Sequence, residues 1–102
     1  MQKISDFMQE LNNTGNKYHI DLSFKNAFSI PCIAQYSEEI NSLLAEKYPN
    51  ESELYITIKN GIPYVKTIHT KFKEISEYNA KLLLMLVYAR HELNYWEVKS
   101  LL

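Results

Sequence analysis

The chain has 102 residues, which is the size of one small domain and leaves no room for a second. Hydrophobic residues make up 46% and charged residues 23%, as in ordinary globular proteins, which argues against wholesale disorder. The formal net charge of −1 provides no overall attraction to nucleic acid or to anionic membranes.

An amphipathic helix is predicted over residues 3–12. Its apolar side chains recur at i, i+3, i+4 and i+7, the spacing that gathers them on one helix face; they are Ile4, Phe7, Met8 and Leu11. Gly15 lies in the polar stretch that follows and tolerates left-handed backbone, so the helix is expected to end before it.

A first hairpin is predicted next. Apolar and polar residues alternate over residues 18–24, which is typical of a half-buried strand, and alternation continues over residues 28–34. Pro31 lacks an N–H, so the second strand is expected to lie at an edge or to be interrupted there. Cys32 is the only cysteine, which excludes an intramolecular disulfide, and its apolar neighbours predict a buried thiol.

A second helix is expected to start at Ser37, because a capping residue is followed there by Glu38 and Glu39, which favour the positive end of the helix dipole. Pro49 and Asn50 should end it.

The second hairpin has the strongest local signal in the chain. Strands are predicted over residues 54–59 and 62–69, joined by Asn60-Gly61, a pair that tolerates the positive φ angles of a tight turn. A two-residue turn pairs Lys59 with Ile62, Thr57 with Tyr64 and Tyr55 with Lys66.

From Thr70 onward the pattern is helical. Asn94 and Glu97 have the spacing of a capping box, so we expect a break near Asn94 and a short final helix. Residues 82–89 are apolar on every side of this helix, more than one small sheet can cover, which predicts a homodimer. The expected dimer interface contains Leu83, Leu84, Val87, Tyr88, Tyr95 and Trp96.

Together these elements predict one α+β domain over residues 1–102. Its order is α-β-β-α-β-β-α, with two hairpins in one antiparallel sheet and the long C-terminal helix packed on that sheet. This order of elements resembles that of small dimeric secretion chaperones, and the resemblance implies a protein-binding dimer.

No motif for catalysis or for a cofactor is present. The chain has only two glycines, Gly15 and Gly61, which excludes a phosphate-binding P-loop and a dinucleotide fingerprint. We therefore predict no catalytic residue, no cofactor and no metal. A small enzyme or metal-binding protein that uses His19, Asp21 and His69 stays open as an alternative.

Charge is distributed unevenly along the chain. Residues 37–53 contain five glutamates against Lys47, whereas residues 54–73 contain four lysines and no acid. By the hairpin register, tyrosines, lysines and isoleucines share one face, and this face is the predicted partner-binding site: Tyr55, Lys59, Ile62, Tyr64, Lys66 and Ile68. Aromatic and aliphatic residues with a few charges are typical of protein interfaces.

We therefore predict a non-enzymatic protein-interaction domain, an adaptor, chaperone-like subunit or inhibitor, that acts as a dimer. The alternative is single-stranded nucleic-acid binding through Tyr55, Lys59, Tyr64 and Lys66, with rings that stack on bases and ammonium groups on phosphates. Charges in residues 1–11 and an apolar run of eight residues, against about 20 for a bilayer, predict a cytoplasmic protein without a signal peptide or membrane span. Ten lysines against Arg90 alone indicate an AT-rich genome, such as that of a bacterium, a phage or a mobile element.

Overall fold

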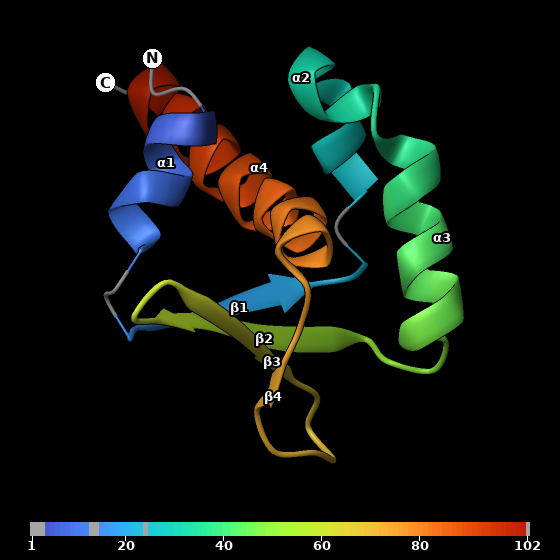
Figure 1. Ribbon diagram of the computed structural model, residues 1–102. Helices are drawn as coiled ribbons and strands as arrows, with labels where there is room; N and C mark the ends of the chain where they lie inside the picture. Colours follow the sequence, from blue (N-terminus) through green and yellow to red (C-terminus); the bar gives the residue numbers. More distant parts are fainter. Residues whose placement is uncertain (1–3, 13–14, 24, 102) are drawn as a thin grey trace.

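The computed structural model describes residues 4–12, 15–23 and 25–101, and all of its helices lie on one side of a four-stranded antiparallel sheet (Figure 1). This arrangement confirms the α+β class and the C-terminal helix packed on the sheet. The elements in chain order are α1 (Ile4–Leu11), β1 (Lys17–Asp21), the 3-10 helix η1 (Lys25–Ser29), α2 (Pro31–Ala34), α3 (Ser37–Lys47), β2 (Glu53–Lys59), β3 (Ile62–Lys66), β4 (Lys73–Glu74) and α4 (Glu77–Leu101).

The β2–β3 hairpin is confirmed in its predicted register. Lys59 pairs with Ile62, Thr57 with Tyr64 and Tyr55 with Lys66. The turn adopts positive φ at both central residues, 53° at Asn60 and 79° at Gly61, as the sequence signal required.

The predicted strand over residues 28–34 is wrong, because η1 and α2 occupy this segment. Pro31 is in the first turn of α2, where its fixed φ favours a helix and its missing N–H costs nothing. Ile33 is fully buried and Cys32 is exposed. The period-two pattern therefore predicted the wrong inward-facing side chains, and the prediction of a buried thiol is wrong. β1 instead pairs with β2, which follows it after a long connection. The observed order of elements therefore differs from the α-β-β-α-β-β-α order on which the resemblance to secretion chaperones was based.

The predicted start of α3 is confirmed, whereas its predicted cap and the predicted start of α4 are wrong. α3 begins at Ser37, but its N-cap is Tyr36 and no side chain caps it. α4 begins at Glu77 rather than near residue 70, because Lys73 and Glu74 pair with β3 first. Ser76 then caps α4: its Oγ accepts a hydrogen bond of 3.1 Å from the backbone N–H of Asn79.

The expected break at Asn94 is also wrong, since α4 continues to Leu101 without interruption. Asn94 and Glu97 fit a helix interior as well as a cap, and no glycine or proline in this segment forces the chain to leave the helix.

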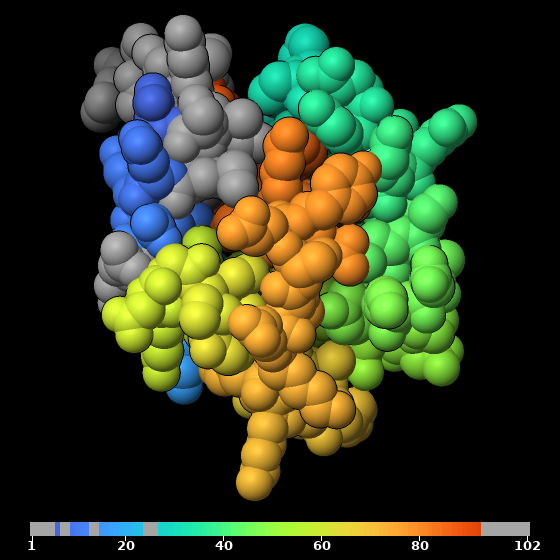
Figure 2. All heavy atoms as spheres, in the orientation of Figure 1, coloured from blue at the N-terminus to red at the C-terminus, as the bar shows by residue number. Residues whose placement is uncertain are grey.

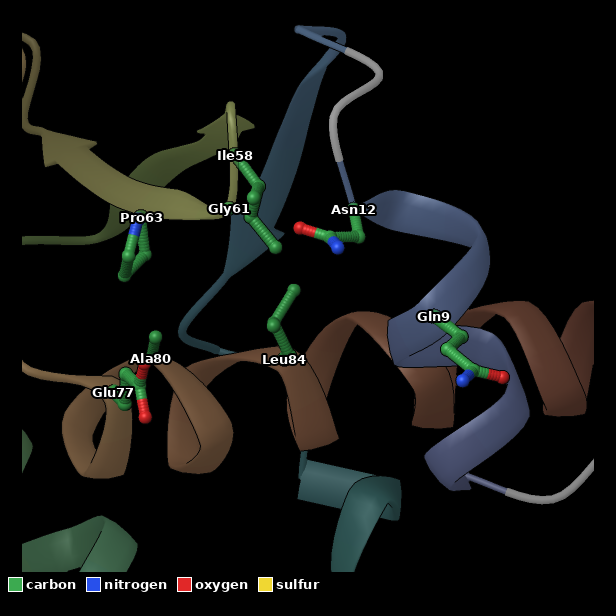
Figure 3. A pocket seen from close by; sticks show the side chains of 8 residues that line it. All are labelled: Gln9, Asn12, Ile58, Gly61, Pro63, Glu77, Ala80 and Leu84. Carbon is green, nitrogen blue, oxygen red and sulfur yellow. The ribbon is translucent and has the colours of Figure 1, made fainter.

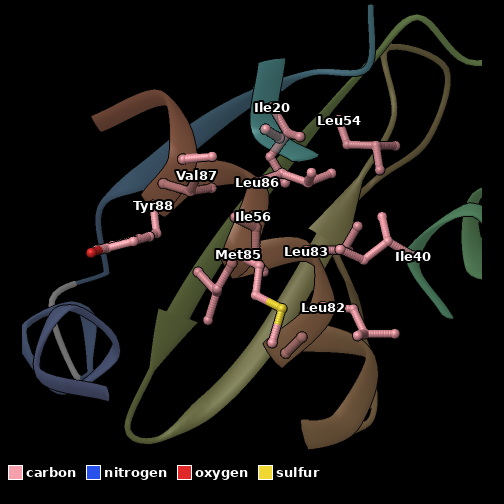
Figure 4. Close-up of a cluster of buried hydrophobic side chains, with 14 of the residues drawn as sticks. Ile20, Ile40, Leu54, Ile56, Leu82, Leu83, Met85, Leu86, Val87 and Tyr88 are labelled. Atoms are coloured by element: carbon pink, nitrogen blue, oxygen red, sulfur yellow. The ribbon is translucent and has the colours of Figure 1, made fainter. Parts of the chain in front are cut away.

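The core lies between α4 and the sheet (Figure 4). Every residue from Leu82 to Ala89 is at most 8% exposed, because β1 and β3 cover α4 on one side while α1, α3 and η1 contact it elsewhere. This part of α4 therefore does not need a second copy of the chain to cover it, and the argument that predicted a homodimer from it is wrong. Four proposed interface residues, Leu83, Leu84, Val87 and Tyr88, belong to this core, and the side chains of Tyr95 and Trp96 lie outside the described part.

Within the described ranges, no helix has the length and apolar content needed to cross a membrane.

Candidate protein-binding face

The sheet has one face against the helices and one face, here called the outer face, on which no described helix packs (Figure 1). Strand alternation and register place a defined set of side chains on it. These are Lys17, His19 and Asp21 from β1, Glu53, Tyr55, Thr57 and Lys59 from β2, Ile62, Tyr64 and Lys66 from β3, and Glu74 from β4.

Five of the six predicted binding residues share this face. Tyr55, Tyr64 and Lys66 are half-buried, whereas Lys59 and Ile62 are exposed. Ile68, which is 56% exposed, lies beyond the end of β3 in the connection to β4. The hairpin register therefore gathers the first five residues but does not determine the position of Ile68.

Phe72 is the aromatic residue that sequence analysis missed, because residues 70–76 were predicted as helix. It contacts two lysines of the outer face: the Phe72 ring centroid lies 5.7 Å from Lys17 Nζ and 6.0 Å from Lys66 Nζ. Lys66 Nζ also lies 5.6 Å from the Tyr55 centroid. The Ser76 cap was the available signal, since it marks the start of α4 and leaves Phe72 in the preceding connection.

Tyr55 is held in place by its neighbours. His19 Nε2 lies 2.9 Å from Glu53 Oε2, the Tyr55 hydroxyl donates a 3.2 Å hydrogen bond to Glu53 Oε1, and the rings of His19 and Tyr55 are 5.2 Å apart. Partial burial raises the pKa of Tyr55, and the bond to Glu53 raises it further, so the hydroxyl stays protonated at neutral pH.

Thr57 is the most unusual residue of the face. It is only 2% exposed, and its Oγ1 has no hydrogen-bond partner in the described part of the chain. It lines a hollow of about 300 Å³ together with Lys59, Tyr64 and Phe72. A buried hydroxyl without a partner costs about 1–3 kcal/mol, so a bound group that reached Oγ1 would recover this energy.

The charges of the outer face are mixed. Three lysines, Lys17, Lys59 and Lys66, share it with three carboxylates, Asp21, Glu53 and Glu74. The Ser23 hydroxyl and backbone N–H donate bonds of 2.6 and 2.9 Å to Asp21 Oδ1, and these bonds lower the pKa of Asp21, which keeps it charged. Such a balance suits a protein surface with both signs of charge better than a phosphate backbone.

Two larger hollows lie elsewhere. One of about 380 Å³ is bounded by α1, the hairpin turn and α4. Of its polar side chains, Gln9 and Glu77 lie at opposite ends and Asn12 lies beside Gly61, so the three do not converge on one point (Figure 3). The other, of about 470 Å³, lies between α3 and α4 beside Glu38, Glu39 and Glu46. Figure 2 shows the orange segment around β4 and the start of α4 running between the yellow-green hairpin and green α3.

The alternative site of His19, Asp21 and His69 has no support in the arrangement of these residues. His19 and Asp21 are neighbours on β1, while His69 lies in the connection after β3. Among the described residues, no group of three or more His, Cys, Asp or Glu side chains could hold a metal ion.

Comparisons of the chain with protein-family models, with curated proteins and with solved structures found no match.

Proposed function

We propose that the chain is a non-enzymatic protein-interaction domain, such as an adaptor, a chaperone-like subunit or an inhibitor, that binds a protein partner on its outer face. The unpartnered hydroxyl of Thr57 in the hollow beside Phe72 carries this proposal. A partner side chain or backbone carbonyl that enters the hollow would meet the Lys59 ammonium group, and it would accept a hydrogen bond from Thr57 once the side chains that cover Oγ1 move aside.

The surroundings of the hollow support a protein occupant. Tyr64 and Phe72 supply rigid aromatic area at its wall, and the exposed Ile62 extends the apolar part. Aromatic anchors around a small pocket, with charged residues at the rim, are the usual composition of an interface centre.

Single-stranded nucleic acid is the second candidate, because lysines and rings alternate on the same face. The lysines could contact phosphates, which favours this candidate, but the ammonium group of Lys66 already lies over the rings of Tyr55 and Phe72. A base could stack on these rings only by displacing Lys66, and the three carboxylates would repel the backbone.

Partner capture tests the proposal. Tagged wild type, Tyr64→Glu and Tyr78→Glu are used to retrieve proteins from the source cells; Tyr78 is 55% exposed on α4, away from the outer face, and provides the matched control. We expect a protein that wild type and Tyr78→Glu retain and Tyr64→Glu loses, with circular dichroism unchanged. Equal capture by all three would contradict the proposal.

A fluorescence titration with a single-stranded oligonucleotide at two salt concentrations separates the second candidate. Phosphate contacts would give an affinity that falls with salt by a slope near −0.7 per contact. We expect no binding at low salt, and steeply salt-dependent binding that Lys59→Glu and Lys66→Glu abolish would favour nucleic acid instead.

A further inference from the structure

The sheet order places β1 at an edge, and no strand in the described part of the chain pairs with the outward side of β1. The Leu22 N–H donates a 3.0 Å bond to the Ser52 carbonyl at the end of the β1–β2 ladder. Antiparallel bonding alternates by two residues, so Tyr18 and Ile20 bond to β2. The N–H and C=O groups of Lys17, His19 and Asp21 therefore point away from β2.

These outward groups are open to a partner. All three residues are exposed, and no hydrogen bond within the described part of the chain reaches their outward backbone atoms. An edge of this kind is a template for adding a strand.

The sequence of β1 is complementary to itself in the antiparallel direction. The strand reads Lys-Tyr-His-Ile-Asp. When two copies pair around His19, Lys17 of one copy lies opposite Asp21 of the second copy, on both sides of the centre. On the inner face Tyr18 lies opposite Ile20 of the second copy. Opposite charges directly across a ladder stabilise it, whereas like charges destabilise it.

We propose that β1 pairs antiparallel with β1 of a second copy and so joins two sheets into one. The residues at positions 17, 19 and 21, whose backbone groups point outward, would form the hydrogen-bonded pairs of the new ladder. The symmetry axis then runs through the sheet, which leaves the helices of both copies on one side and makes the two outer faces continuous. The inference goes beyond the proposed function, because it does not depend on what the outer face binds.

Sedimentation velocity over a range of protein concentrations tests the pairing with two charge reversals. Lys17→Glu brings position 17 opposite Asp21 of the second copy, and Asp21→Lys brings position 21 opposite Lys17, so each variant alone carries like-charged pairs. We expect each reversal to weaken self-association by about tenfold.

An equimolar mixture of the two variants supplies the decisive control. In the mixed dimer, the glutamate of the Lys17→Glu chain lies opposite the lysine of the Asp21→Lys chain, and the native Asp21 lies opposite the native Lys17. Both pairs then have opposite charges, so we expect the mixture to associate about as strongly as wild type. The Asp21→Lys chain also lacks the Asp21–Ser23 hydrogen bonds. It still lacks them in the mixture, so a recovery of association there must come from the charged pairs.

A second pair of variants tests the backbone ladder without the charges. His19→Pro removes the outward N–H at the centre of the edge while leaving the bonds of Tyr18 and Ile20 to β2, and His19→Ala keeps that N–H. We expect a monomer for the proline variant and a dimer for the alanine variant, with circular dichroism used to check that both are folded.

Three results would overturn the inference. They are a wild-type chain that stays monomeric at all concentrations, a dimer that both charge reversals leave intact, and a mixture that associates no better than its components. The charge-reversal mixture decides the question even if His19→Pro fails to fold.

Discussion

The two faces of the sheet differ in how completely their side chains are buried. The inner face is closed: Ile20, Leu54 and Ile56 are each at most 2% exposed beneath the helices. The outer face has no described helix over it, and Phe72 with the lysines around it covers only its centre. The inner face is optimised for burial, whereas the outer face retains an unpartnered buried hydroxyl at Thr57 that stability alone would not favour.

The largest effect should come from breaking the inner face. Leu83 is fully buried, so Leu83→Ala leaves a cavity and is expected to lower the free energy of unfolding by about 2–5 kcal/mol. Urea denaturation measures this change. Lys59→Ala on the outer face is the control and should change stability by less than about 0.5 kcal/mol; equal losses would mean that the two faces do not differ as described.

The second-largest loss of stability is expected from substitutions in the Asn60-Gly61 turn, which determines the face on which each hairpin side chain lies. Gly61 has a φ of 79°, which a side chain makes unfavourable, so Gly61→Ala should cost about 1–2 kcal/mol. Gly61→Asn should cost less, because asparagine tolerates positive φ. Thermal unfolding compares the two variants, and a smaller loss for alanine than for asparagine would contradict this explanation.

Two buried threonines should respond in opposite directions to the same change. Thr57→Val removes a hydroxyl without a partner and should raise the free energy of unfolding by about 1 kcal/mol while weakening partner capture. The Thr67 hydroxyl accepts a 3.0 Å bond from the His69 N–H and lies 3.2 Å from Thr70 Oγ1, so Thr67→Val should destabilise by a similar amount. If Thr57→Val destabilises as well, the hydroxyl has a partner in solution.

The smallest effect concerns pH. Hydrogen bonds from Ser23 lower the pKa of Asp21 below its ordinary value, so the folded state binds this proton more weakly than the unfolded state does. The resulting stability is present at neutral pH and is lost as the pH falls from about 4 through the folded-state pKa. Ser23→Ala should reduce this acid sensitivity in urea titrations from pH 7 to pH 2, and an unchanged profile would show that Ser23 does not control it.

Local signals explain which parts of the fold were predictable. The hairpin register followed from Asn60-Gly61 alone, because two residues there determine every pair along β2 and β3. The strand prediction over residues 28–34 was wrong, because alternating apolar residues fit a strand as well as they fit η1 and the short helix that Pro31 begins. The pairing of β1 with β2 depends on tertiary packing across about 30 residues, and no local pattern encodes it.

The outer face was predictable from the sequence only where the hairpin register determines it. The register that the Asn60-Gly61 turn imposes is enough to gather Tyr55, Tyr64 and Lys66 on one face. A cap at Ser76 could have placed Phe72 outside the helix, but the contacts of Phe72 and the hollow over Thr57 were not foreseeable, because they depend on how the connection between β3 and β4 folds back over the sheet.

Photocrosslinking tests the binding role of the outer face most directly. Benzoylphenylalanine is placed at Tyr64, and in a matched chain at Tyr78, and both proteins are irradiated in the source cells. We expect a defined protein adduct from position 64 that position 78 does not give and that Thr57→Val diminishes. No protein adduct at position 64, or the same adducts at both positions, would contradict a partner-binding outer face.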